Sequence, residues 1–234
     1  MKTSRSFTVS AVCGIITILF SSQLKAASLD ISNHSFESFV LSDGTFSQPT
    51  GSGFGGIPSA NPIPAWTISG NAGSWNNTSA ELPPGTTEGV NTAWLHSATI
   101  QQTLIDVLVA GTYTLSVDAG FTIGGGSPGY RTSLLAGSTL LAQDNNMLVL
   151  PFGSLATSTI QYIAGQANPF LGQPLTIRIQ SLGVETVFDN VRLSVVPIPE
   201  PATYLLLVVG LTVLLRRVNA RTAHPDARAP SAAA

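Results

Sequence analysis

The chain has 234 residues, of which 44% are hydrophobic and only 9% are charged, and its formal net charge is −2. Between Ser28 and Val196 it holds ten acidic residues, three arginines and no lysine, which gives this segment a net charge of −7. Nucleic acid and anionic lipid are poor partners for such a surface, whereas neutral glycans or cations suit it. The one cysteine, Cys13, lies in the N-terminal apolar segment, so the chain beyond that segment has no disulfide and no thiol for catalysis or metal binding.

Residues 1–27 have the layout of a secretory signal peptide. Lys2 and Arg5 form a positive start, Phe7–Phe20 is uncharged and mostly apolar, and residues 21–27 hold the expected cleavage site. An uncleaved anchor is the alternative. In both cases the middle of the chain faces outward from the inner membrane, so export is predicted.

Residues 28–196 show a hydrophobic pattern of period two, which is typical of β-strands. The segments between the strands are rich in Gly, Ser and Pro, and none has the pattern of a long helix. About ten short strands predict one all-β domain, an antiparallel jelly-roll β-sandwich. The predicted strands are Ser28–Phe39, Ala65–Ser69, Val90–Leu95, Thr99–Val109, Gly111–Phe121, Tyr130–Leu135, Thr139–Gln143, Ser158–Ala164, Leu175–Leu182 and Thr186–Val196.

Residues 197–217 differ from the domain before them. The triplet Pro199, Glu200 and Pro201 leads into the uncharged run Ala202–Leu215, which ends at two arginines. Fourteen helical residues extend about 21 Å, short of the about 30 Å hydrocarbon core, so the run predicts a marginal single membrane helix. A buried core helix is the alternative. Residues 218–234 are rich in Ala and Pro and are predicted to be a disordered extension.

This order of proline motif, apolar helix and basic pair resembles the PEP-CTERM sorting signal of Gram-negative bacteria. The resemblance implies that an exosortase-type transpeptidase recognises Pro199, Glu200 and Pro201. It also implies a transient anchor in the inner membrane, followed by release to the cell surface or the exopolysaccharide matrix. The extension 218–234 departs from the family pattern, in which the basic cluster ends the chain.

The two ends of the domain read ISNHSFES at 31–38 and VFDNVRLSVV at 187–196. They resemble the first and last strands of galactose-binding-like jelly rolls, including carbohydrate-binding modules of families 4 and 9. That resemblance implies a structural calcium ion held by Glu37 and Asp189 together with backbone carbonyls, which is chemistry that calcium favours. The alternative is that Glu37 caps a turn and Asp189 accepts bonds from local backbone amides. The other motifs that carry the resemblance are PAWT at 64–67, NTAWL at 91–95, IQQTL at 100–104 and GTYTLSVDAG at 111–120.

No catalytic motif emerges from the residues. The G-x-S-x-G match at 125–129 places Pro128 after the serine, and proline has no N–H for an oxyanion. His34 and His96 have no serine, cysteine or second histidine at a diagnostic spacing. Glu81, Glu88 and Asp144 lie in predicted loops or at their edges and could supply the two carboxylates of a glycosidase. Any acidic β-domain offers such pairs by chance, so they do not indicate an enzyme. The sequence therefore predicts a protein that is not an enzyme.

Binding of a sugar needs an exposed aromatic ring with amides beside it. Trp75, in the small and polar segment GNAGSWNNTS, is the candidate ring, with Asn76 and Asn77 as hydrogen-bonding neighbours. Tyr130 and Arg131, after the Gly-rich loop, are the second choice. Trp66 and Trp94 are predicted to lie in the core. The alternative for Trp75 is that it covers one end of the sandwich.

Together these features predict an exported protein at the cell surface of a Gram-negative bacterium that binds extracellular polysaccharide without catalysis. Two alternatives remain open: a purely structural matrix or biofilm protein without a glycan site, and a glycan-active hydrolase. The hydrolase requires two carboxylates that face each other across a cleft.

Overall fold

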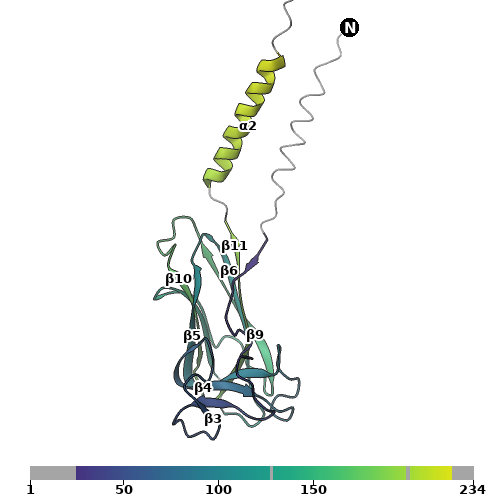
Figure 1. Ribbon diagram of the computed structural model, residues 1–234, viewed down its shortest axis with the longest axis vertical. Helices are drawn as coiled ribbons and strands as arrows, with labels where there is room; N and C mark the ends of the chain where they lie inside the picture. The colour runs from purple at the N-terminus through teal and green to yellow at the C-terminus, as the bar shows by residue number, and fades with distance from the viewer. Residues whose placement is uncertain (1–24, 127–128, 199–200, 223–234) are drawn as a thin grey trace, which may run out of the picture. The chain divides into compact units, whose positions relative to one another are not determined.

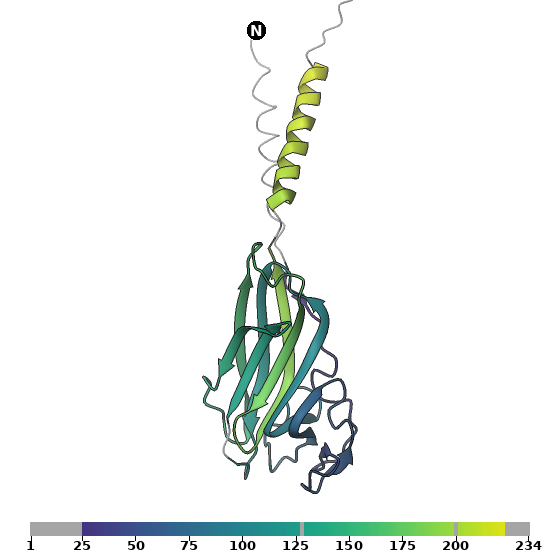
Figure 2. The ribbon, with the colours of Figure 1, turned by 90° about the vertical axis from the view of Figure 1, so that its left-hand side faces the viewer.

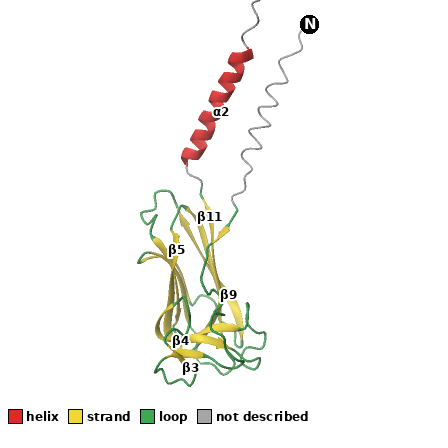
Figure 3. Ribbon diagram, viewed as in Figure 1, coloured by secondary structure: helices red, strands yellow, loops and turns green. Residues whose placement is uncertain are grey.

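The structure, a computed structural model, describes residues 25–126, 129–198 and 201–222. Strands dominate the part up to Pro197 (Figure 3). Nine of them form one sheet that folds over itself, and β2 and β3 form a small parallel pair. The strands are β1 (Ala27–Ser28), β2 (Ser47–Pro49), β3 (Ile57–Ser59), β4 (Thr67–Asn76), β5 (Asn91–Val107), β6 (Gly111–Phe121), β7 (Tyr130–Ala136), β8 (Thr139–Asn145), β9 (Ser154–Ala164), β10 (Pro174–Ser181) and β11 (Thr186–Pro197).

Strand β5 joins the two layers of this domain. Its first part pairs with β11, with Leu95 opposite Thr186, and its later part pairs with β10, with Ile100 opposite Ile179. Ser97 separates the two parts and has a φ of 47°, which bends the strand. Figure 1 shows β5 and β10 on one side of the domain and β6, β9 and β11 on the other, and Figure 2 shows the strands running alongside one another. The expectation of a mostly β, sandwich-like fold is confirmed.

Strand β6 illustrates how the sequence builds the core. Tyr113, Leu115 and Val117 are buried, whereas the residues between them are partly exposed, because successive side chains of a strand point to opposite faces. The buried side chains pack against those of the facing layer, such as Ile100 and Ile177, in one continuous core. The hairpin of β7 and β8 lies where the sequence predicts it.

The predicted first strand, 28–39, is wrong for most of its length. Strand β1 covers only Ala27–Ser28, and the chain then turns, because Asn33 and Phe36 adopt left-handed backbone angles with φ of 53° and 63°. This turn buries Phe36 completely and places Glu37 against the loop that precedes β5. A local alternation of residues cannot reveal such a turn.

The residues from Ile198 onward form a separate compact unit. Its described part is the helix α2 (Pro201–Thr222). A membrane-spanning helix was expected here, but among the described residues no helix combines the length and the apolar character needed to cross a membrane. Of the predicted sorting motif, Pro201 begins α2, whereas Pro199 and Glu200 lie outside the described residues, as do residues 1–24 and 223–234.

Candidate active site

Three side chains on the β4–β5 pair line a pocket on the same face. Trp94 and His96 alternate along β5, so they point to the same side. Trp75 stands on β4 opposite Thr92, which lies two positions before Trp94 on that same face. The strand pair therefore supplies two indole rings and one imidazole to the pocket.

A glycine on β4 brings a fourth ring to this face. A Cβ atom at Gly73 would lie 1.9 Å from the backbone oxygen of Ser47, so only glycine lets β2 approach so closely. That oxygen accepts a hydrogen bond of 2.9 Å from the indole nitrogen Nε1 of Trp94. The neighbouring Phe46 ring then packs on Trp94 and Trp75, with centroid distances of 5.4 Å and 6.1 Å.

Phe54 lies in the Gly-rich segment between β2 and β3. Together with Phe46, Trp75 and Trp94 it forms the aromatic wall of the pocket. The Phe54 ring packs on Trp94 and His96, with centroid distances of 5.7 Å and 5.0 Å, while 42% of the residue stays exposed. The amide oxygen of the buried Gln48 accepts the backbone N–H of Phe54 and holds the segment in place. The pocket is partly open and has a volume of about 90 Å³, smaller than a typical ligand pocket, so it favours one flat ring system over an extended ligand.

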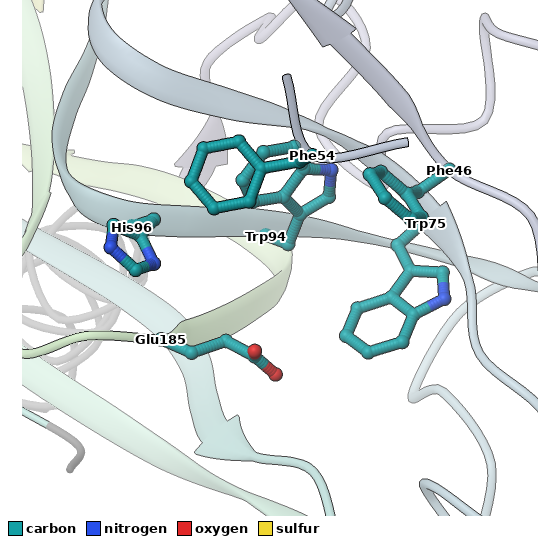
Figure 4. Close-up of a pocket in the computed structure, with 6 residues that line it drawn as sticks. All are labelled: Phe46, Phe54, Trp75, Trp94, His96 and Glu185. Atoms are coloured by element: carbon teal, nitrogen blue, oxygen red, sulfur yellow. The ribbon is translucent and has the colours of Figure 1, made fainter. Parts of the chain in front are cut away.

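Glu185 is the one carboxyl group among the described residues that line this pocket. It immediately precedes β11, whose Thr186 pairs with Leu95. This register brings Glu185 to the level of His96. Figure 4 shows the carboxyl group extending toward Trp75 on the side of the pocket opposite Phe54. Its Oε1 atom accepts a hydrogen bond of 2.8 Å from the hydroxyl of Thr122, which is buried.

Two indole rings, two phenyl rings and one imidazole ring around one carboxyl group define a particular chemistry. The rings offer flat apolar faces to an aromatic substrate, and their π-electrons stabilise a positive charge that forms over them. Glu185 and His96 are the lining residues that can hold or move a proton. The pocket thus has the parts of a site for acid-assisted chemistry on a small aromatic compound.

Of the residues predicted to bind a ligand, Trp75 lines this pocket and is half-buried. Asn76 and Asn77 do not join it. They line a separate polar hollow of about 330 Å³ together with Asp43. There the side-chain amide of Asn76 donates to the backbone oxygen of Leu41, and Asn77 accepts the hydroxyl of Thr92.

Tyr130 and Arg131 stand on β7 and not in the pocket. Tyr130 is completely buried, and its hydroxyl donates to Asp144. It therefore has no surface to offer a ligand, because its ring belongs to the core. Arg131 points to the outer face of the sheet, where its Nε donates to Asn145 at 3.0 Å.

Glu37 and Asp189 both hold the loop before β5. Glu37 accepts the backbone N–H groups of Val90 and Asn91 at 2.8 Å and 2.7 Å. Asp189 is fully buried and accepts three backbone N–H groups, those of Thr87, Glu88 and Asn190. Burial raises the pKa of Asp189 to about 7, although the three bonds from backbone amides favour its charged form.

No group of three or more His, Cys, Asp or Glu side chains that could hold a metal ion occurs among the described residues. Calcium also binds amide and backbone oxygens, so two carboxylates do not exclude it. Next to Glu37, the buried side-chain oxygen Oδ1 of Asn91 has no hydrogen-bond partner. An oxygen without a donor, on a residue that contacts the Glu37 carboxylate, fits a cation that prefers oxygen ligands.

The sequence interpretation missed Phe46, Phe54 and Glu185, and it assigned no catalytic role to His96. Phe54 is the one aromatic residue in the stretch GSGFGG, where a ring has no strand neighbours to pack on. That isolation was a usable signal. Nothing local marks Glu185, because its role depends on the register between β5 and β11.

Fold and site together define a protein with a mostly β domain and an aromatic pocket that, among the described residues, contains one carboxyl group. A family model confirms and narrows this class. The HpiC1-like family, described as HpiC1 cyclase, matches residues 27–194, and the chain belongs to this family. A search of curated proteins finds no match.

Solved structures agree with the family. A Stig cyclase, Fisc from Fischerella sp. TAU, in complex with (3Z)-3-(1-methyl-2-pyrrolidinylidene)-3H-indole, is 30% identical with a TM-score of 0.64, and the match covers 75% of this chain and 100% of that one. A cyclase from Fischerella sp. TAU in complex with 4-(1H-indol-3-yl)butan-2-one is 31% identical with a TM-score of 0.61, covering 74% and 100%.

Carbohydrate-binding modules occur among the structural neighbours only at low likeness. The CBM22-1 xylan-binding domain from Paenibacillus barcinonensis is a structural neighbour at 14% identity and a TM-score of 0.43, covering 75% of this chain and 96% of that one. The family match shows instead that the expectation of a non-catalytic polysaccharide-binding protein is wrong, because the family is one of cyclases. The PEP-CTERM, exopolysaccharide and biofilm assignments find no support in these comparisons.

Proposed function

We propose that this protein is a cyclase that closes a ring on a small substrate containing an indole or a similar flat aromatic group. The observation that carries the proposal is the pocket in which aromatic rings surround the carboxyl group of Glu185. The family supplies the reaction class. Two Fischerella cyclases at 30% and 31% identity are in complex with compounds that contain an indole unit, which supports the substrate class.

The size of the pocket favours this substrate class. A space of about 90 Å³ accepts one flat ring system, with the rest of the substrate outside or at the opening beside Phe54. Aromatic pairs stack with ring centroids about 4.5–7 Å apart, the spacing that the lining rings already keep among themselves. A flat substrate ring inserted there can stack on the lining rings at the same centroid spacing.

Glu185 acts as the proton donor and acceptor in the reaction that we propose. In its acid form it gives its proton to one carbon of an alkene (C=C) in the substituent of the substrate ring, and the other alkene carbon becomes a cation. The substrate ring forms the new C–C bond to that cation, and the Glu185 carboxylate takes the proton that the ring carbon loses. The product is an isomer of the substrate, and the rings of Trp75, Trp94 and Phe54 stabilise the cation between the two steps.

The test uses a probe whose ring closure has a single outcome, 3-(4-methylpent-3-enyl)indole. Protonation of its double bond and attack by indole carbon C2 give a six-membered ring. In D2O the proton on Glu185 comes from solvent, so we expect a cyclic product that carries one deuterium. Mass spectrometry after chromatography measures both the new compound and its added mass. Absence of a protein-dependent cyclic product from this probe and from related alkenylindoles would count against the proposal.

Glu185→Gln is the matched variant, because it keeps the size of the side chain and removes the transferable proton. We expect it to abolish deuterium-labelled product while the protein still binds 4-(1H-indol-3-yl)butan-2-one. Undiminished product formation by Glu185→Gln would show that another group moves the proton.

We also propose a structural calcium ion near Glu37, Asn91 and Asp189. Its support is the unpartnered Oδ1 of Asn91 and the two carboxylates that hold the same loop. When bound, the ion would fix this loop through charge. We expect added calcium to raise the melting temperature, and Glu37→Gln to weaken that response but Glu185→Gln to leave it intact. If neither added calcium nor a chelator changes the melting temperature, the proposed ion is excluded.

Export remains a proposal that rests on the N-terminal sequence pattern alone. Lys2, Arg5 and the apolar stretch that follows carry it. Fractionation of a bacterium that expresses the full protein, with periplasmic and cytoplasmic markers, tests it. Full-length protein confined to the cytoplasm would contradict it.

A further inference from the structure

One hydrogen bond joins the carboxyl group of the pocket residue Glu185 to a buried residue that does not line the pocket, Thr122. Thr122 follows directly on β6, and only 2% of the residue is exposed. Its hydroxyl donates to the Oε1 atom of Glu185 at 2.8 Å. Among the described residues this is the one hydrogen bond that the Glu185 side chain makes, so the second oxygen, Oε2, is the one left for a substrate.

Backbone hydrogen bonds on both sides of this contact fix the position of Thr122. The backbone oxygen of Thr122 accepts the N–H of Gly125, which closes a tight turn, and Ile123 donates its N–H to the backbone oxygen of Glu81. A Cβ atom at Gly125 would lie 2.9 Å from the Thr122 hydroxyl and 3.2 Å from Oε1 of Glu185. A side chain at position 125 would therefore intrude between donor and acceptor.

We infer that Thr122 is a positioning residue, which holds one oxygen of the Glu185 carboxyl group so that the other faces the substrate in the pocket. A glutamate side chain has three rotatable bonds, and a partly exposed one loses rotamer freedom when it binds a ligand. A buried hydroxyl that fixes the carboxyl group in advance removes part of that cost. The inference rests on the proposed function, since it assigns a role to Glu185.

A double-mutant cycle on the full-length protein tests this role. The measured quantity is the dissociation constant of 4-(1H-indol-3-yl)butan-2-one, by calorimetry, for the wild type, Thr122→Val, Glu185→Ala and the double variant. We expect Thr122→Val to weaken binding by about 3- to 10-fold, which corresponds to the net contribution of one ordinary hydrogen bond. In the Glu185→Ala background the same substitution should change nothing, because its effect passes through that carboxyl group.

Two further variants separate positioning from folding. Thr122→Ser keeps the hydroxyl and should restore wild-type binding. Gly125→Ala keeps both partners but crowds the bond between them, so it should reproduce the effect of Thr122→Val. Thr157→Val is the matched control, because the hydroxyl of Thr157 donates to Asp118 at 2.6 Å outside the pocket, and its loss should leave binding unchanged.

The outcomes distinguish this inference from the proposed function. If the probe does not bind, the proposed function fails and the inference fails with it. If Glu185→Ala binds the probe as the wild type does, only the inference fails, because proton transfer to a substrate does not require the carboxyl group to contribute to binding of this probe. If Glu185→Ala weakens binding but Thr122→Val has no effect, only the inference is overturned. It is also overturned if Thr122→Val weakens binding equally in both backgrounds, which is the result expected of a merely structural residue.

Discussion

Two carboxyl groups in this domain have opposite surroundings. Asp189 is completely buried, and both of its oxygens accept backbone N–H groups, three in all. Glu185, four residues earlier, is half-buried and accepts one bond from a threonine hydroxyl beside a ring of aromatic side chains. Both oxygens of the first group are held by backbone amides, whereas the second has one oxygen without a hydrogen bond among the described residues.

This difference distinguishes a structural carboxylate from a functional one in a β-sandwich. A carboxyl group whose oxygens are all engaged by backbone amides stabilises the structure, because its removal leaves those amides without partners. A carboxyl group held on one side only, in an aromatic pocket, is available for chemistry. Substitutions at these two positions should therefore separate stability from function.

The largest effect is expected for the stability of Asp189→Ala. Three backbone amides lose their acceptor, so the free energy of unfolding should fall by about 3–5 kcal/mol. Urea denaturation followed by tryptophan fluorescence measures this change. Asp189→Asn, which keeps an acceptor oxygen, should lose less. A loss below about 1 kcal/mol for Asp189→Ala would show that the loop does not depend on this side chain.

Glu185→Gln should produce the opposite pattern. Turnover of 3-(4-methylpent-3-enyl)indole should fall by at least about 100-fold, because general acid–base catalysis contributes about 10²–10⁴-fold. The free energy of unfolding should change by about 1 kcal/mol or less, since the side chain is half-buried and has one partner. Equal losses of stability and turnover would remove the distinction between the two carboxyl groups.

Most of the fold could be predicted from the sequence. The alternating pattern of residues 111–121 matches β6 residue for residue, and the β7–β8 hairpin lies at its predicted place. The alternation depends on local chemistry that period two captures. The turn at Asn33 and Phe36 escaped prediction because it depends on left-handed backbone angles and on contacts with the loop before β5.

The site could be predicted only in part. Trp75 was identified from its small and polar neighbours, and it does line the pocket. Tyr130 was chosen for its place after a Gly-rich loop, yet the fold buries it beside Asp144. Glu185 and Phe46 reach the pocket through strand register and the close approach at Gly73, which no single segment encodes.

Trp75→Ala should weaken binding of 4-(1H-indol-3-yl)butan-2-one by about 10-fold, since a stacked aromatic pair contributes about 0.5–1.5 kcal/mol beyond the loss of buried area. Calorimetry measures the dissociation constant. Phe54→Ala should act in the same direction at a smaller cost in stability, because Phe54 is 42% exposed. If neither variant binds more weakly, the aromatic wall does not form the binding surface.

The smallest effect is expected for Arg131→Ala. Its side chain lies on the outer face of β7 and bonds Asn145, and it does not line the pocket. Binding of the same probe should change by less than about twofold, the usual range for surface substitutions. A clear loss of affinity would point to a ligand surface on that sheet face instead.

The aromatic pocket beside Glu185 is the proposed active site, and a crystal structure of the protein with 4-(1H-indol-3-yl)butan-2-one tests that assignment most directly. We expect the indole ring between Trp75, Trp94 and Phe54, with a polar atom of the ligand within hydrogen-bond distance of the free Glu185 oxygen. Electron density for the compound in the polar hollow beside Asn76 and Asn77, with the aromatic pocket empty, would contradict the assignment.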